Sequence, residues 1–242
     1  MNTDIDMRIS GSGNIPSGEY GKVTVSGIGH LTGRVRCESL SSSGSIKGKD
    51  IECKEGFSAS GSSHFAGNIE AKTVKVSGSM HCEGNLIAHE SFSSSGSTEC
   101  GKSAKCEHMT VSGSLKVNGD IEAEGFKIDG TVNCGGLLNA ESIEIKFDRG
   151  MTIGSIGGGK IAILPEKTLK AAQKLIPFHT LSKGVSVNTA IEGDEVTLEG
   201  VSCPRVTGRV ITVGQGCNID LIQYRESIKI SPNATVGKVA KI

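Results

Sequence analysis

VKVSGSMHCEGNLIAHESFSSSG, residues 74–96, is one turn of a repeat whose phase is set by Gly78 and Gly96. Counted in both directions from this segment, a small residue followed by glycine recurs every 17 or 18 residues. A period of this size is typical of a solenoid, in which each repeat stacks on the one before it. The glycines of the series are Gly27, Gly44, Gly61, Gly78, Gly96, Gly113 and Gly130.

Each of these pairs is predicted to form a corner of the coil. The residue before the glycine is serine in every turn except the last, where it is Asp129. Such side chains can hydrogen-bond to nearby backbone, while glycine can adopt a positive φ without steric cost. We therefore expect the corner glycines to have positive φ.

Apolar and polar residues alternate between the corners, which predicts short strands with one buried face. Each coil has three such pairs, so the sequence predicts an all-β fold, a triangular parallel β-helix of about 17 residues per coil. In the quoted turn the inward pairs are Val74 with Val76, Met80 with Cys82, and Leu86 with Ala88.

Three segments are predicted along the chain. Residues 1–147 form N-terminal coils, residues 148–195 an irregular coil with a helical insertion, and residues 196–242 C-terminal coils. In the insertion, Pro165 stands at a helix-start position, and Leu169, Ala172 and Ile176 have helical spacing. Beyond Ile145 the corner strand is recovered by inward pairs at Ile161 and Ile163, Val196 and Leu198, Ile211 and Val213, and Ile228 and Ile230.

Composition excludes several classes of function. The chain has 26 basic and 26 acidic side chains, which argues against nucleic-acid binding driven by phosphate contacts. Aromatic residues make up 3% and tryptophan is absent, so the core must consist of small aliphatic side chains. The sequence contains neither a secretion signal nor a membrane-spanning run, which predicts a cytoplasmic protein with peripheral membrane association at most.

Cysteines and histidines are the candidate metal ligands. No C-x-x-C spacing occurs, and six of the eight cysteines fall on inward columns, so we expect free thiols that pack in the core. These six are Cys37, Cys53, Cys82, Cys100, Cys106 and Cys134. His30, His64 and His81 share an outward position, and stacking would bring His64 and His81 to about 4.8 Å. A solvated ladder of imidazoles is favoured over a metal site there.

Catalytic motifs are missing from the sequence. The stretch GSIGGGK, residues 154–160, lacks the Ser or Thr that a phosphate-binding loop needs after Lys160, so it is interpreted as a solenoid turn. No nucleophile elbow or H-E-x-x-H motif occurs. The sequence therefore predicts no enzyme, no cofactor and no metal.

The closing segment VTLEGVSCPRVTGRVITVGQGCNIDLIQYRESIKISPNATVGKVAKI, residues 196–242, resembles the bactofilins, as do the Ser/Gly-rich coils. The likeness is to the longer, two-lobed members of Gram-positive bacteria. This resemblance implies a right-handed β-helix that polymerises end to end into filaments without a nucleotide and supports cell-shape, envelope or motility machinery. The proline-rich flanking tails usual in the family are absent, and the helical insertion departs from its compact core.

The ends of a β-helix carry unpaired strand edges that promote association unless a cap covers them. No amphipathic capping helix is evident at either terminus. We therefore predict a homopolymer joined end to end, with envelope or motility proteins as further partners. The insertion would cap the stack or dock a partner. The candidate self-association residues are Ile9, Ile15, Tyr20, Val236, Val239 and Ile242.

An enzyme remains the alternative. Hexapeptide-repeat acyltransferases are also triangular parallel β-helices, and His179 lies in an insertion of the kind that carries their catalytic histidine. Their coil has 18 residues built on a small-residue hexad, whereas this coil has 17 and no strict six-residue step. A carbohydrate-cleaving β-helix would need aromatic platforms, and the chain has two tyrosines.

Overall fold

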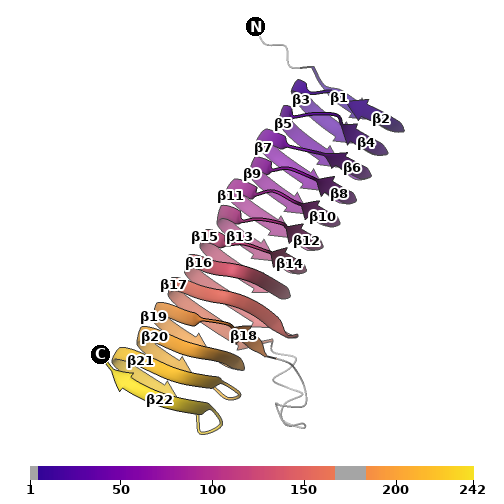
Figure 1. Ribbon diagram of the computed structural model, residues 1–242. Helices are drawn as coiled ribbons and strands as arrows, with labels where there is room; N and C mark the ends of the chain where they lie inside the picture. The colour runs from indigo at the N-terminus through magenta and orange to yellow at the C-terminus, as the bar shows by residue number, and fades with distance from the viewer. Residues whose placement is uncertain (1–4, 167–183) are drawn as a thin grey trace. The chain divides into compact units, whose positions relative to one another are not determined.

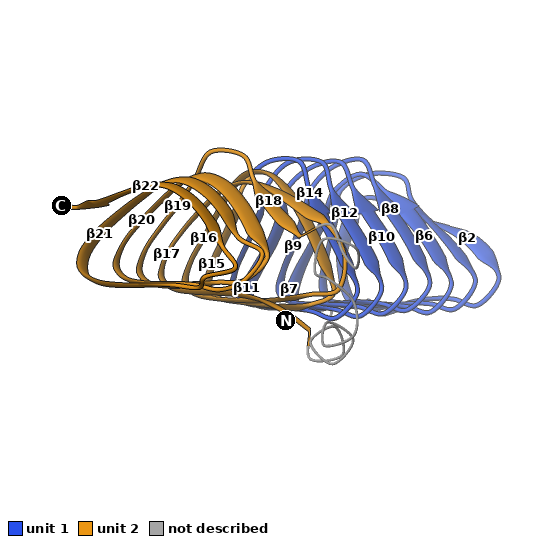
Figure 2. Ribbon diagram, turned by 90° about the horizontal axis from the view of Figure 1, so that it is seen from below, with its two compact units in different colours: residues 1–119 blue, residues 120–242 orange. Residues whose placement is uncertain are grey.

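A computed structural model describes residues 5–166 and 184–242. In these ranges all regular secondary structure is β-strand (Figure 1). The strands belong to two compact units, residues 1–119 and 120–242, which Figure 2 colours separately. The predicted helical insertion, with Leu169, Ile176 and His179, lies outside the described residues.

Unit 1 is a stack of coils, each with one long and one short strand. The long strands pair in parallel with the next long strand, and the short strands do the same. The strands of unit 1 are β1 (Met7–Ile9), β2 (Ser12–Ile15), β3 (Gly18–Val25), β4 (Ile28–Leu31), β5 (Val35–Ser42), β6 (Ser45–Gly48), β7 (Ile51–Ala59), β8 (Ser62–Phe65), β9 (Ile69–Val76), β10 (Ser79–Cys82), β11 (Leu86–Ser94), β12 (Ser97–Cys100), β13 (Ala104–Val111) and β14 (Ser114–Val117).

The long strand supplies two of the three predicted faces. In β11 the register shifts between Ala88 and Ser91, and the alternation of buried and exposed side chains restarts after the shift. With the short strand, each coil therefore has three segments that point side chains inward. The predicted parallel β-helix is confirmed.

Unit 2 continues the same pattern with longer strands. Its strands are β15 (Ile121–Asp129), β16 (Thr131–Phe147), β17 (Met151–Pro165), β18 (Val185–Val187), β19 (Ala190–Leu198), β20 (Val201–Val213), β21 (Asn218–Ile230) and β22 (Thr235–Lys241). Residues 151–165, in the segment that we expected to be irregular, form β17 instead, which pairs with β16 and β19. The glycines at 157–159 do not interrupt this strand, because the neighbouring coils hold its backbone in register.

Strand register reproduces the period of the sequence. Val25 pairs with Ser42 and Ser42 with Ala59, at the predicted separation. In unit 2, Ile163 pairs with Leu198 although 35 positions separate them. The inward column therefore passes from β17 to β19 as the hydrophobic pattern predicted.

The core lies inside the coils and is thin. The predicted inward side chains are buried in the described coils before the last one, including polar members such as Ser42 and Ser94. Phe57 and Phe65 pack edge to face, with ring centroids 5.6 Å apart and ring planes at 76°. Burial of such rings is the main hydrophobic contribution that one coil can make.

The corner glycines are required by a close approach of backbones, so the predicted positive φ was wrong. Positive φ occurs among the described residues only at Gly200 and Gly216. A Cβ on Gly44 would overlap the carbonyl oxygen of Gly27, and one on Gly61 would overlap that of Gly44. The same relation holds at Gly27, Gly78, Gly96 and Gly113. Successive coils therefore approach along this corner at a distance that only glycine allows.

A second corner of unit 1 is stabilised by side-chain oxygens. Asp50 Oδ1 accepts a hydrogen bond from the backbone nitrogen of Asn68 at 2.8 Å, and Asn68 Oδ1 accepts one from Asn85 at 2.8 Å. Asn85 Oδ1 in turn accepts a bond from the nitrogen of Ser103 at 3.3 Å. Each coil thereby provides an acceptor for the backbone of the next coil.

Candidate functional site

The N-terminal edge of unit 1 consists of β1 and β2. β1 pairs with the second half of β3, and β2 pairs with β4; among the described residues neither has a strand on its other side. Of the predicted self-association residues, Ile9 is half-buried and Ile15 is fully buried. Tyr20 is half-buried, and its hydroxyl donates a hydrogen bond to the carbonyl of Pro16 at 2.9 Å.

This edge also exposes two isoleucines that the sequence analysis did not select. The exposed fraction is 70% for Ile5 and 56% for Ile28. Ile28 opens β4 directly after the corner glycine, on the outward side of the alternation. The repeat predicts that the Ile28 side chain faces outward, but a single apolar residue at an outward position does not indicate a binding surface.

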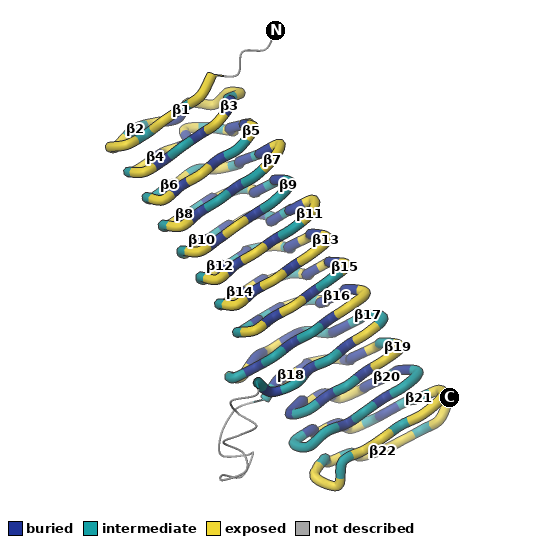
Figure 3. Tube along the Cα trace, turned by 180° about the vertical axis from the view of Figure 1, so that it is seen from behind, coloured by how far each residue is buried: buried dark blue, intermediate teal, exposed yellow. Residues whose placement is uncertain are grey.

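The C-terminal edge of unit 2 consists of β22 and the second half of β21. β22 pairs with residues 218–224 of β21, so Ser227–Ile230 has only β20 beside it among the described strands. Val239 is 43% exposed and Ile242 56%, whereas Val236 is half-buried. Figure 3 shows the change from the alternating pattern of the inner coils to nearly continuous exposure along β22.

The inward column of unit 2 also ends at this edge. Ile211 and Val213 are buried, and they pair with Ile228 and Ile230 of the following coil. Ile228 is half-buried and Ile230 is 37% exposed, because no further described strand covers them. The same side chains that form the core in inner coils are thus open to solvent in the last coil.

The eight cysteines are free thiols and all are buried, as predicted for the six on inward columns. Burial raises the pKa of Cys106 to about 12 and that of Cys134 to about 11, because the thiolate is poorly solvated in the core. These thiols therefore stay protonated near neutral pH. Cys203 and Cys217 are buried in the same way.

The histidine ladder forms as the spacing predicted. The rings of His64 and His81 stack with centroids 5.0 Å apart and planes at 5°. His64 Nε2 lies 3.5 Å from Glu83 Oε1, and His81 Nδ1 lies 3.4 Å from Glu99 Oε2. His30 is not adjacent to His64, because it pairs with Lys47, and Lys47 in turn pairs with His64. Among the described residues no group of three or more His, Cys, Asp or Glu side chains is placed to hold a metal ion.

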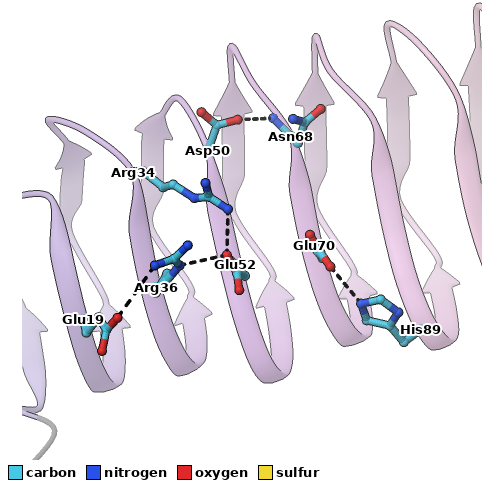
Figure 4. A network of polar contacts seen from close by, with 8 residues as sticks. All are labelled: Glu19, Arg34, Arg36, Asp50, Glu52, Asn68, Glu70 and His89. Atoms are coloured by element: carbon cyan, nitrogen blue, oxygen red, sulfur yellow. Dashed lines mark hydrogen bonds and ion pairs between the residues drawn. The ribbon is translucent and has the colours of Figure 1, made fainter.

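Charged side chains link neighbouring coils on the outer surface (Figure 4). Glu52 Oε2 accepts hydrogen bonds from Arg34 Nη2 at 2.8 Å and from Arg36 Nε at 3.0 Å. The bond from Arg36 is the main cause of a lowered pKa for Glu52. His89 Nε2 lies 3.0 Å from Glu70 Oε1 in the same manner. These contacts link side chains of adjacent coils across the outer surface.

A shallow groove of about 350 Å³ crosses unit 2 where Gly158, Gly193 and Gly208 lie in register. Arg209 on its wall forms ion pairs with Glu195 and Glu226, and the wall carries charges of both signs. This groove is not predictable from the repeat, because glycines at separations of 35 and 15 do not follow the 17-residue period. Its lining side chains form no catalytic constellation.

The structure describes the glycine-rich stretch but not the candidate catalytic histidine. Residues 154–160 lie inside β17 as part of a coil, so the interpretation of GSIGGGK as a solenoid turn is confirmed. His179, the candidate of the acyltransferase alternative, lies outside the described residues. No helix in the described part of the chain is both long and apolar enough to span a membrane.

Comparison with known proteins identifies a family for the N-terminal part of the chain. Residues 1–87 match the family model described as Bactofilin, polymer-forming cytoskeletal. This match lies at the opposite end of the chain from residues 196–242, on which the resemblance chiefly rested.

Two curated proteins of Bacillus subtilis (strain 168) are similar to parts of the chain. YhbF is 28% identical over 108 residues, which cover 44% of this chain and 42% of YhbF. YhbE is 27% identical over 108 residues, which cover 44% of each protein. Both carry the description uncharacterized, and the aligned part spans less than half of either relative. No solved structure matches the chain. Residues 1–87 therefore match the bactofilin family, described as polymer-forming cytoskeletal, and the resemblance predicted from the sequence is confirmed for that part of the chain.

Proposed function

We propose that this protein is a structural subunit that assembles end to end into filaments without a nucleotide. The observation that carries the proposal is the uncovered C-terminal coil of unit 2, together with the polymer-forming family of residues 1–87. In this proposal the filament is a cytoplasmic scaffold for cell-shape, envelope or motility machinery.

The uncovered edges supply the chemistry for association. An outer strand edge presents backbone N–H and C=O groups at the spacing of the β-ladder, and another parallel strand can pair with them. The edges of β22 and of Ser227–Ile230 have this character. Pairing there would also cover Ile230, Val239 and Ile242, whose apolar surface is open in the single chain.

Charge does not oppose such contacts. The chain has equal numbers of acidic and basic side chains, so two copies experience little long-range repulsion. Along β22, Lys238 and Lys241 are the charged residues, and β1 offers Arg8. Because all three are cationic, they form no ion pair with one another across such a contact, which would rest on backbone pairing and apolar burial.

The test is electron microscopy and analytical sedimentation of the purified full chain, with and without ATP or GTP. Filaments or end-joined rods that form equally well in both conditions would support the proposal. The variant Val239→Lys places a charge on the exposed edge and should shorten the assemblies. Thr110→Lys adds the same charge to an exposed position of an inner coil and serves as the matched control.

Two outcomes would overturn the proposal. One is a monodisperse monomer at high protein concentration and low salt. The other is equal filament length for Val239→Lys and Thr110→Lys, because an edge contact must be more sensitive to a charge at Val239.

A further inference from the structure

Two cysteines of adjacent coils lie close enough to be joined. Cys37 in β5 pairs in register with Cys53 in β7, and their Sγ atoms are 3.4 Å apart. In-register neighbours on parallel strands have Cα atoms about 4.8 Å apart, within the range that a disulfide spans. Both side chains point into the core, so the pair already has the relative placement that the bond needs.

A pocket is lined by one of the two cysteines. It has a volume of about 70 Å³ and is lined by Cys37 together with Glu19, Tyr20, Arg36, Glu52 and Lys54. Figure 4 shows three of its lining side chains, Glu19, Arg36 and Glu52. A water molecule occupies about 30 Å³ in the liquid, so the pocket has room for a molecule with two oxygen atoms. Cys53 does not line this pocket.

The two thiols differ in their surroundings as well. A hydrogen bond with Cys37, followed by burial, raises the pKa of the Cys53 thiol. Cys53 therefore keeps its proton, while Cys37 is the cysteine that lines the pocket.

A second cysteine pair in the same unit provides an internal comparison. Cys82 in β10 pairs in register with Cys100 in β12, and both are fully buried. Here the thiols donate to backbone carbonyls, Cys82 to Gly67 at 3.2 Å and Cys100 to Gly84 at 3.3 Å. Cys82 and Cys100 also hydrogen-bond to each other, so register and hydrogen bonding treat the two pairs alike. The pocket lined by Cys37 is what distinguishes the first pair.

We propose that Cys37 and Cys53 are a peroxide-sensitive site at which oxidation links two adjacent coils. Hydrogen peroxide reaches Cys37 Sγ through the pocket, the O–O bond breaks, and the products are a sulfenic acid and one water. The Cys53 sulfur then attacks Cys37 Sγ, and the S–S bond forms. The hydroxyl of the sulfenic acid leaves with the Cys53 proton as a second water. The two sulfurs together lose two electrons, which the peroxide takes up.

The experiment treats the native full chain with hydrogen peroxide at neutral pH, then counts free thiols in denaturant and maps links by mass spectrometry of a digest. The expected result is a fall from eight free thiols to six, with Cys37 linked to Cys53. Cys53→Ala should abolish the link and leave a sulfenic acid at Cys37 that dimedone labels. Cys100→Ala should leave the link unchanged.

Three outcomes would overturn the inference. They are eight thiols after peroxide treatment, formation of a Cys82–Cys100 link as fast as the Cys37–Cys53 link, and the absence of a dimedone label on Cys37 in the Cys53→Ala variant. Because the thiol count and the link map use the wild-type chain, they remain decisive if a variant fails to fold. The site does not depend on assembly, so its failure and the failure of filament formation can be told apart.

Discussion

Replacing Gly78 by alanine places a methyl group where the previous coil already has an atom. A Cβ at this position would overlap the carbonyl oxygen of Gly61. That carbonyl also accepts a hydrogen bond from the nitrogen of Ser79 at 3.0 Å, and the nitrogen of Ser77 donates to Ala59 at 2.8 Å. The coils can relieve the overlap only by moving apart, and this movement weakens both bonds.

The size of the effect follows from these two bonds. A backbone group left unpaired in a packed region loses about 1–3 kcal/mol, so Gly78→Ala should reduce the free energy of unfolding by about 2–6 kcal/mol. Gly11→Ala is the matched control, because a Cβ there meets nothing within 4 Å. Urea unfolding followed by circular dichroism compares the two variants. Equal stability of Gly78→Ala and Gly11→Ala would refute the close-approach explanation of the corner.

Three further changes test the core and the surface network. Phe57→Ala should lower the free energy of unfolding by about 3–5 kcal/mol, because it opens a cavity beside Phe65; a loss below about 1 kcal/mol would mean that the coil closes around the gap. Ser94→Ala should lower the free energy of unfolding by about 1 kcal/mol, because Thr98 Oγ1 then lacks its hydrogen-bond partner at 3.0 Å. A higher free energy of unfolding in a urea titration would contradict this. Glu52→Gln should lower the melting temperature at neutral pH but not in strong acid, because the lowered carboxyl pKa stabilises the fold only above that pKa; an equal loss at both pH values would show a packing effect instead.

The repeat made the fold predictable because it fixes both the period and the phase of the buried side chains. Once the glycine of one corner is placed, inward residues follow at fixed offsets, and Ile163 could be matched with Leu198 across the longer interval. The reason for the glycine was not predictable in the same way. A positive φ and a close approach of another backbone both require glycine, and a single sequence cannot show which of the two causes applies.

The candidate site was predicted less completely than the fold. The terminal apolar residues were found from the expectation that the ends lack caps, but Ile15 is buried while Ile5 and Ile230 are exposed. The alternation of apolar and polar residues predicts burial of an inward side chain only where another coil packs beyond it. At the first and last strands the neighbour is missing, so the local chain path decides exposure. The proximity of the Cys37 and Cys53 sulfurs likewise depends on register, in which this coil slips by one residue.

The position of the open edges also follows from the energetics of a solenoid. Each inner coil has stabilising contacts with a coil on either side, whereas within residues 5–166 and 184–242 the coil that ends with β22 pairs with a strand on one side alone. That coil is therefore the least stabilised of its stack, and its apolar side chains remain exposed. A second copy seated on β22 would supply the missing contacts, so association and ordering of the last coil should reinforce each other. In our proposal, the incomplete coil that weakens a single chain is what drives the chain to polymerise.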